Sequence, residues 1–220
     1  DVELTGAGFS VTPHKAMFPD IAKSLKLKVE SRLPAIRITD LLLEVDARTE
    51  FSNAFTHLRS GRTADNKLAL LTAILADGIN LGLTRMADVS PGLTMRQLAW
   101  AHDWHIREEG YTAAHAILVN AQRQLPLAGL WGDGTTSSSD GQYFPAGGHA
   151  EAIGDLNARY GPNPGAKFYR FTSDQYGAFH IIAMNANASE AIYVLDGLLY
   201  HGSDLAIETH YVDTGGVSDM

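Results

Sequence analysis

GDGTTSSSDGQ, residues 132–142, is a run of small and polar residues that carries Asp140 directly in front of a glycine. HYVDTGG, residues 210–216, carries Asp213 in front of a threonine and two glycines. Glycine beside a carboxylate lets backbone or a metal ion approach closely. Carboxylates are hard oxygen ligands that divalent cations prefer. Two of them brought together therefore predict a metal site suited to phosphoryl chemistry.

The chain around these two motifs has the pattern of a small sheet. Four segments are expected to be strands, with one helix between the third and the fourth strand. The expected strands are residues 135–144, 168–171, 178–184 and 207–212, and the expected helix is residues 189–201. On that helix the apolar side is expected to carry Ile192, Leu195, Leu198 and Leu199.

This order of elements, with an acid on the first strand and another at the end of the fourth, resembles the front half of a ribonuclease H-like fold. In that fold the first and fourth strands lie side by side. The resemblance implies that Asp140 and Asp213 come close enough to share a metal ion.

The region before Trp131 is expected to be mainly helical, because its apolar residues recur at helical spacing. One long buried helix is expected from Leu68 to Leu83, with Gly78 and Gly82 four residues apart where another helix packs closely. We therefore expect an α+β chain with two regions, a helical one over residues 1–130 and a sheet region over residues 131–220.

The excess negative charge lies in the second region. Residues 1–130 carry 14 Lys+Arg and 14 Asp+Glu, and residues 131–220 carry 3 Lys+Arg and 11 Asp+Glu, which gives the net charge of −8. A solvated acidic surface explains this as readily as carboxylates that converge on metal. A segment with this much negative charge is a poor DNA binder by itself. DNA binding therefore needs bound cations or basic parts outside the segment.

Composition excludes several classes of protein. There is no cysteine, which excludes a disulfide scaffold and a cysteine-based zinc site, and a reducing, cytoplasmic setting is expected. No apolar run approaches a membrane span, since Asp77 and Asn80 interrupt the best candidate, so no membrane partner is expected. The first residue is Asp1 and no secretory leader is visible, which suggests a piece of a longer protein.

Other polar and aromatic residues have plainer explanations. Asp133 is the rival of Asp140 for the first metal position. Asp174 lies in an expected hairpin turn, where turn formation is the simpler role. Trp100 and Trp104, four residues apart, are expected to belong to a core stripe on a helix.

Several blocks of this sequence resemble the replicative transposases of the Tn-three family, and the resemblance covers most of the chain from about residue 33. The blocks are ITDLLLEVD at residues 38–46, FTHL at 55–58, LADGINLGL at 75–83, WGDGTTSSSDGQ at 131–142, YVLDGLLYH at 193–201 and HYVDTGG at 210–216.

The resemblance implies a DDE transposase, which uses two Asp and one Glu to hold two Mg²⁺ ions, with Mn²⁺ as a substitute. Such enzymes nick the 3′ ends of a transposon and join them to target DNA. Asp140 matches the first catalytic Asp of the family and Asp213 the second. The catalytic Glu of the family follows far downstream, and no Glu follows Asp213 here. The resemblance thus implies a fragment of the catalytic region that is inactive alone.

The partners implied are transposon ends and target DNA, together with further copies of the transposase in the complex that carries out transposition. A different class of function stays open, namely a non-catalytic module for assembling that complex or for contacting DNA. A Glu on a downstream helix of the gene would favour the catalytic alternative, and a natural stop near residue 220 would favour the module.

Overall fold

The computed structural model forms two compact units that divide between Ile38 and Thr39. It describes residues 2–5, 8–11, 19–145, 156–157, 159 and 161–213. In the first unit, β1 (Val2–Thr5) and β2 (Gly8–Val11) pair as an antiparallel hairpin, and α1 (Asp20–Glu30) buries none of its residues. The hairpin departs from the mainly helical character expected of the first 130 residues.

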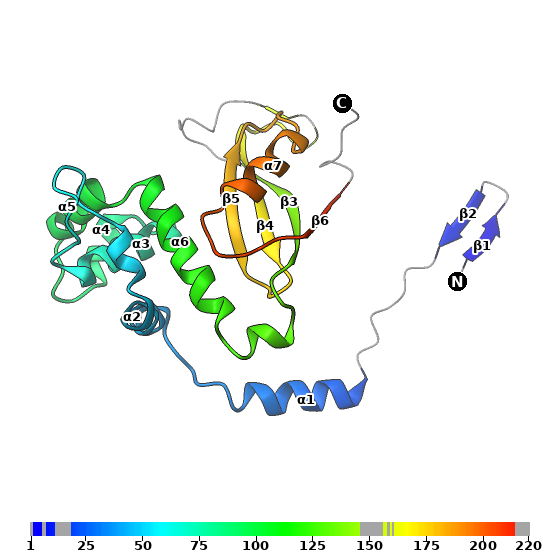
Figure 1. Cartoon of the computed structure of the whole chain (residues 1–220), viewed down its shortest axis with the longest axis horizontal. Helices are drawn as coiled ribbons and strands as arrows, with labels where there is room; N and C mark the ends of the chain where they lie inside the picture. The colour runs from blue at the N-terminus through cyan, green and yellow to red at the C-terminus, as the bar shows by residue number, and fades with distance from the viewer. Residues whose placement is uncertain are drawn as a thin grey trace. The chain divides into compact units, whose positions relative to one another are not determined.

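The second unit begins with a group of helices and ends with a mixed sheet (Figure 1). Buried apolar side chains hold the helices together in two clusters, one around Phe55 and Leu70 and the other around Leu98 and Met86. The helices are α2 (Ile38–Thr49), η1 (Phe51–Ala54), α3 (Lys67–Gly78), α4 (Leu83–Asp88), α5 (Met95–His105), α6 (Glu108–Arg123) and η2 (Ala128–Leu130).

The long helix expected from Leu68 to Leu83 is wrong, because the chain breaks it into α3 and α4. Asn80 and Gly82 both adopt positive φ, at 52° and 79°, which a continuing helix does not allow. No heavy atom lies within 4 Å of a Cβ built on Gly78 or Gly82, so these glycines do not mark a close helix contact either. Instead, Gly78 is the last residue of α3 and Gly82 is the N-cap of α4.

The sheet has the strand order β5-β4-β3-β6. Its strands are β3 (Thr136–Pro145), β4 (Gly165–Ser173), β5 (Ala178–Met184) and β6 (Thr209–Val212). The first three strands pair antiparallel, whereas β6 pairs with β3 in parallel. The chain reaches β6 through α7 (Ala191–Leu199), so the expected succession of helices and then a mixed sheet is confirmed.

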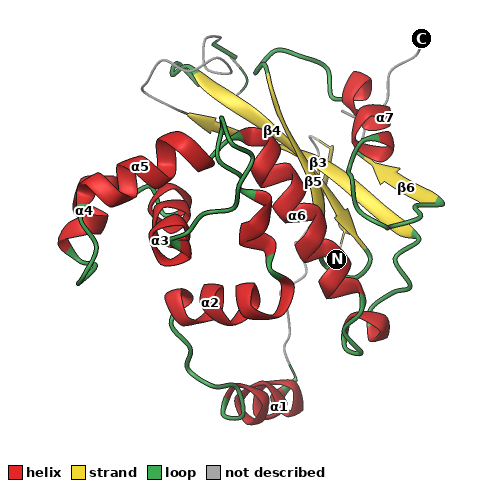
Figure 2. Ribbon diagram, turned by 60° about the vertical axis from the view of Figure 1, so that its left-hand side comes forward, coloured by secondary structure: helices red, strands yellow, loops and turns green. Residues whose placement is uncertain are grey.

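Helices cover one face of this sheet. A buried cluster of Tyr169, Phe171 and Phe179 packs against Val119 of α6 and Leu198 of α7. In Figure 2, α6 lies between the sheet and helices α3, α4 and α5. The opposite face of the sheet carries the exposed side chains that alternate with this core.

The apolar side expected for α7 is wrong in part. Ile192, Leu195 and Leu199 are 68%, 64% and 70% exposed, and only Leu198 of the expected set packs on the sheet. The reason is Gly197, which is buried so close to Phe171 that a Cβ there would overlap the aromatic ring. The helix therefore turns the side that carries Gly197 toward the sheet.

Candidate active site

The parallel pairing of β3 and β6 brings the backbone positions of the two predicted site residues together. Ser137 lies opposite His210 and Ser139 lies opposite Val212. Asp140 and Asp213 are the next residues along the two strands, and both are exposed. The register therefore makes the backbone positions of Asp140 and Asp213 neighbours at one edge of the sheet, with Asp213 just past the end of β6. The rest of the second motif, residues 214–216, lies outside the described residues.

The charges of both carboxylates affect the pKa of Tyr169 on the neighbouring strand β4. Its side chain is fully buried, and this burial is the main cause that raises the pKa of its phenol, against the lowering effect of its hydrogen bond with Ser139. The negative charges of Glu190, Asp213 and Asp140 raise the pKa of Tyr169 further. Asp140 and Asp213 therefore both act on a single buried hydroxyl behind the sheet edge.

A buried hydrogen-bond network joins β3 to β6 directly behind these positions. The His210 ring nitrogens Nδ1 and Nε2 lie 2.7 Å from Oγ of Ser137 and 2.8 Å from Oγ of Ser139. Oγ of Ser139 in turn lies 2.6 Å from the hydroxyl of Tyr169. Burial lowers the pKa of His210, so its neutral ring has one nitrogen to donate and one to accept. The network links β3 and β6 just before Asp140 and Asp213.

A buried ion pair supports the next residue of β3. Lys167 of β4 and Glu190, just before α7, are both buried and lie 2.5 Å apart. A Cβ on Gly141 would overlap the Glu190 carboxylate and come within 2.8 Å of the Lys167 side chain. The glycine after Asp140 is thus required by close packing, as the motif suggested, although a buried ion pair takes the place expected for backbone or metal.

On the exposed face, Arg170 of β4 lies opposite Asp140. These two residues line a shallow hollow of about 390 Å³, together with Gln142, Phe168 and Ile181. Arg170 does not stand out in the sequence, because nothing in the local sequence shows which β4 residue pairs with Asp140. Its place on the exposed face is, however, the one that period-2 alternation along β4 predicts.

Asp133, the rival of Asp140, lies at the opposite end of β3. Its carboxylate accepts hydrogen bonds from the hydroxyl and the backbone N–H of Thr135, at 2.6 and 3.0 Å, and these lower the pKa of Asp133. Asp174 accepts a hydrogen bond from the backbone N–H of Gly134 at 3.0 Å. Both aspartates therefore stabilise turns at the end of the sheet that lies away from Asp213.

The donor set at this edge is suited to a hard cation but is small. Asp140 and Asp213 supply carboxylate oxygens, the ligand type that Mg²⁺ and Mn²⁺ prefer. Within residues 19–145 and the described part of 156–213, no group of three His, Cys, Asp or Glu side chains gathers closely enough to hold a metal ion. Glu190 is near but faces the buried side, paired with Lys167.

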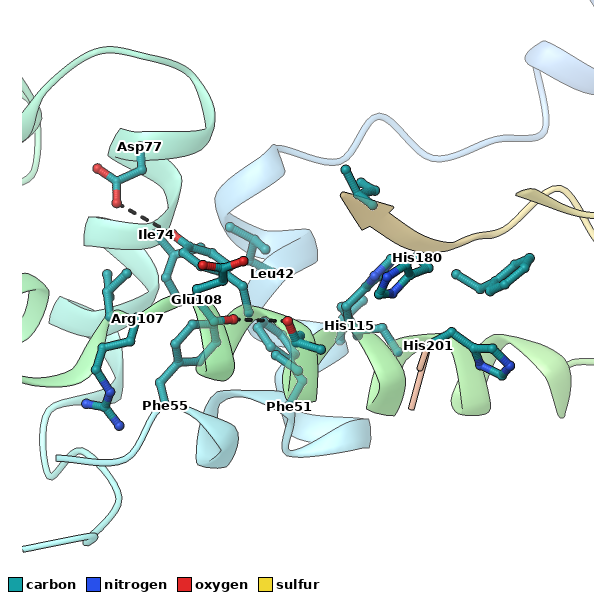
Figure 3. Close-up of a pocket in the computed structure, with 18 of the residues that line it drawn as sticks. Leu42, Phe51, Phe55, Ile74, Asp77, Arg107, Glu108, His115, His180 and His201 are labelled. Atoms are coloured by element: carbon teal, nitrogen blue, oxygen red, sulfur yellow. Dashed lines mark hydrogen bonds between the residues drawn. The ribbon is translucent and has the colours of Figure 1, made fainter. Parts of the chain in front are cut away.

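A separate cavity of about 800 Å³ lies between the helices and β5 (Figure 3). His115, His180 and His201 lie at one end of it, and Asp77 and Arg107 lie toward the other. Burial lowers the pKa of each of the three histidines. Leucine, isoleucine and phenylalanine side chains make up most of the remaining wall, and neither predicted site aspartate lines it.

Comparison with known proteins assigns the chain to a family. Residues 40–220 match the Tn3 transposase DDE domain. The chain belongs to this family. The transposase for transposon Tn501 of Pseudomonas aeruginosa is 53% identical over 219 residues, which is 100% of this chain and 22% of that protein.

Two further relatives agree. The transposase for transposon Tn21 of Escherichia coli is 52% identical over 219 residues, again 100% of this chain and 22% of the relative. The transposase for transposon gamma-delta of Escherichia coli (strain K12) is 35% identical over 199 residues, 89% of this chain and 20% of the relative. The chain thus spans about a fifth of the length of these curated relatives. The resemblance drawn from its motifs is confirmed.

No helix within the described residues is both long enough and apolar enough to cross a membrane.

Proposed function

We propose that this chain is part of the catalytic region of a DNA transposase, in which Asp140 and Asp213 hold divalent metal ions at the edge of a ribonuclease H-like sheet. The observation that supports the proposal is the parallel register of β3 and β6, which ends at Ser139 and Val212, one residue before each of these two exposed aspartates. The match to the Tn3 transposase DDE domain supports the same chemistry. The reaction proposed is nicking of transposon 3′ ends and their joining to target DNA.

In this proposal each nearby residue has a defined task. Asp140 and Asp213 bind and orient Mg²⁺, or Mn²⁺ in its place. A bound divalent ion lowers the pKa of an attacking water or 3′-hydroxyl and stabilises the leaving oxygen. Arg170, exposed on the same face, supplies a positive charge for a DNA phosphate. His210 positions the two aspartates through its hydrogen bonds to β3.

We also propose that the 220-residue chain neither cleaves nor joins DNA by itself. Its candidate site offers two carboxylates, whereas a DDE site uses three. Glu190 does not serve as the third, because taking it from Lys167 would leave a buried cation without a partner. A test is strand transfer onto target DNA from pre-nicked transposon ends with Mn²⁺. Joining by this chain that Asp140→Ala abolishes would refute the proposed inactivity.

Metal binding tests the site itself. Titration of the chain with Mn²⁺, followed by calorimetry or by the electron paramagnetic resonance of free Mn²⁺, should show weak binding that Asp140→Asn and Asp213→Asn each reduce by tenfold or more. Asp133→Asn is the matched control, since the amide can keep the turn through its own carbonyl oxygen. Equal binding by all three variants would refute the assignment of Asp140 and Asp213.

A second candidate function is a non-catalytic part in assembling the transposition complex. The exposed apolar residues Ile192, Leu195 and Leu199 of α7 favour it, since such a stripe is typical of a surface that contacts more protein. The same titration separates the two candidates. Mn²⁺ binding that depends on Asp140 and Asp213 supports the catalytic role, and no such binding leaves assembly as the better explanation.

A further inference from the structure

A second polar surface lies on the helical part of the molecule, formed by the loop of residues 57–62 and one side of α5. Arg96, Trp100 and Trp104 follow one another at intervals of four residues, so they lie along one side of that helix. Arg59 of the loop lies over the Trp104 ring, with its guanidinium 5.1 Å from the ring centre. We call Arg59, Arg62, Arg96 and Trp100 the arginine–tryptophan surface.

The loop that carries two of these arginines is held in one conformation. The backbone N–H of His57 donates to the carbonyl of Arg62 at 2.8 Å, and the N–H of Gly61 donates back to the carbonyl of His57 at 2.9 Å. Nδ1 of His57 accepts a hydrogen bond from the backbone N–H of Arg59 at 3.2 Å. A partner that binds here therefore does not have to order the loop first.

The aromatic side chains divide into a support and an exposed ring. His57 stacks on Trp104, with ring centres 5.1 Å apart and planes 8° apart, so Trp104 is covered on that side. Trp100 is 49% exposed, and the core position expected for it from the sequence is wrong. The largest side chain on this part of α5 thus presents about half of its surface to solvent, next to Arg96 and one helical turn from the ring that Arg59 covers.

Trp100 also lines a small hollow of about 210 Å³ with Arg96, Asn66 and Gln97. Asn66 uses its side-chain oxygen to accept from Ala69, and Gln97 uses its own to accept from Thr94. The amide N–H₂ groups of Asn66 and Gln97 have no acceptor among the described residues. The hollow is smaller than the roughly 300–1,000 Å³ of drug-sized ligand sites, and its exposed lining is mostly apolar, which suits a single flat ring.

The positive charge of this surface is not neutralised. No carboxylate within the described part of the chain lies at salt-bridge distance from Arg59, Arg62 or Arg96. Arg48 and Arg107, by comparison, pair with Glu44 and Glu109. Single exposed arginines are usually only solvated. An exposed tryptophan and a ring-sized hollow lined by Arg96, on the same part of the molecule as Arg59 and Arg62, call for a partner with both anionic and flat aromatic groups.

Nucleic acid has both properties. Its phosphates pair with arginine, and an unstacked base packs on an exposed aromatic ring. We propose that the arginine–tryptophan surface binds DNA, with Arg59 and Arg62 on phosphates and an unstacked base on Trp100. This inference rests on the proposed action of the protein on DNA. Because α5 lies on the far side of α6 from the sheet (Figure 1), the contact is to DNA away from the proposed metal site.

The test measures binding of the 220-residue chain to a fluorescein-labelled oligothymidine 20-mer by anisotropy over a series of salt concentrations. The double variant Arg59→Ala/Arg62→Ala should bind at least tenfold more weakly at 100 mM salt or below. Its plot of log affinity against log salt should also be shallower by about 0.7 for each phosphate that the variant no longer neutralises. Arg59→Ala and Arg62→Ala are also measured singly. Arg48→Ala, which removes one exposed arginine from α2, is the charge-matched control for these single variants and should bind as the parent chain does.

The base contact is tested with Trp100→Ala. Stacking of a base on an aromatic ring corresponds to a loss of about 5- to 100-fold in affinity when the ring is removed. Trp131→Ala is the matched control, because Trp131 is 59% exposed next to Tyr176, away from α5. Binding should also quench tryptophan fluorescence in the parent chain and in Trp131→Phe, and much less in Trp100→Phe.

The proposal is overturned if the parent chain does not bind the oligonucleotide. It is also overturned if the double arginine variant or Trp100→Ala binds no more weakly than its control. None of these outcomes bears on the metal site, since Mn²⁺ titration of the same Trp100→Ala protein reports on Asp140 and Asp213 separately. A chain that binds Mn²⁺ but not DNA would therefore refute this surface and leave the proposed function standing.

Discussion

The backbone at Gly141 runs against the buried Lys167–Glu190 ion pair, one residue after Asp140. A side chain there would push the carboxylate away from its lysine, and a buried pair that is separated costs several kcal/mol. The small residue after Asp140 was apparent from the sequence, and its general meaning, a close approach, was predicted. The group that approaches could not be predicted, because it comes from a distant segment whose position only the folded sheet defines.

Gly141→Ala should therefore lower the free energy of unfolding by about 1–3 kcal/mol, since overpacking a tight site costs that much. Urea denaturation followed by circular dichroism measures the effect. Gly129→Ala is the matched control, because no heavy atom lies within 4 Å of a Cβ built there and its φ is not positive. A Gly141→Ala protein as stable as Gly129→Ala would mean that the ion pair can move aside freely.

At the scale of an element, α7 shows why its buried side was mispredicted. Helical periodicity favours the side with the most large apolar residues, Ile192, Leu195 and Leu199, yet these are exposed. The side that packs on the sheet instead places Gly197 against the aromatic ring of Phe171, with Tyr193, Val194 and Leu198 beside it. Sequence patterns record hydrophobicity but not the shape of the opposite surface, so they located the helix and failed on its rotation.

Gly197→Ala should destabilise the chain by about 1–3 kcal/mol, despite the better helix propensity of alanine, because the added methyl overlaps the Phe171 ring. Leu195→Ala removes far more apolar volume from the same helix but should change the free energy of unfolding by less than about 0.5 kcal/mol, as is usual for exposed sites. Thermal unfolding of the two variants measures both. The reverse order would show that α7 buries its leucine side.

The same limit applies to α3 and α4. The apolar spacing from Leu68 onward predicted helix correctly, but it did not reveal the break near Asn80 and Gly82, where positive φ values end the helix. The position of β5 was predicted more accurately, since this strand occupies the predicted residues 178–184. Alternation along a strand is fixed by the chain itself, whereas a break between two helices depends on how their ends pack.

For the whole molecule, the boundary between helices and sheet is marked by three histidines. His115 of α6, His180 of β5 and His201 after α7 come from three different elements and meet at the end of one cavity (Figure 3). Burial is the first cause that lowers the pKa of each. For His180, the charge of Asp196 opposes this effect, and the other two histidines add to it. Burial between the helices and the sheet therefore favours the neutral form of these three imidazoles in the folded chain.

The pH dependence of stability follows from the lowered pKa of these three histidines in the folded chain. A histidine whose folded pKa lies below its unfolded value of 6.5 binds more protons in the unfolded chain, so stability rises with pH between the two values. The stabilising contribution is fully present above pH 6.5 and is lost as pH falls through the lowered folded pKa. The melting temperature should therefore decrease from pH 7.5 to pH 5.5, a window above the ordinary carboxylate pKa values.

Differential scanning calorimetry at pH 7.5, 6.5 and 5.5 measures this decrease, and His180→Gln/His201→Gln should show a smaller one because two of the titrating groups are gone. High salt provides the control. Repulsion between exposed charges is screened by salt, but the cost of charging a buried imidazole is not, so the decrease should persist at 1 M NaCl. A melting temperature that stays constant or rises toward pH 5.5 would show that water or a carboxylate reaches these rings. The packing of the helices on the sheet would then not depend on the neutral form of the three histidines.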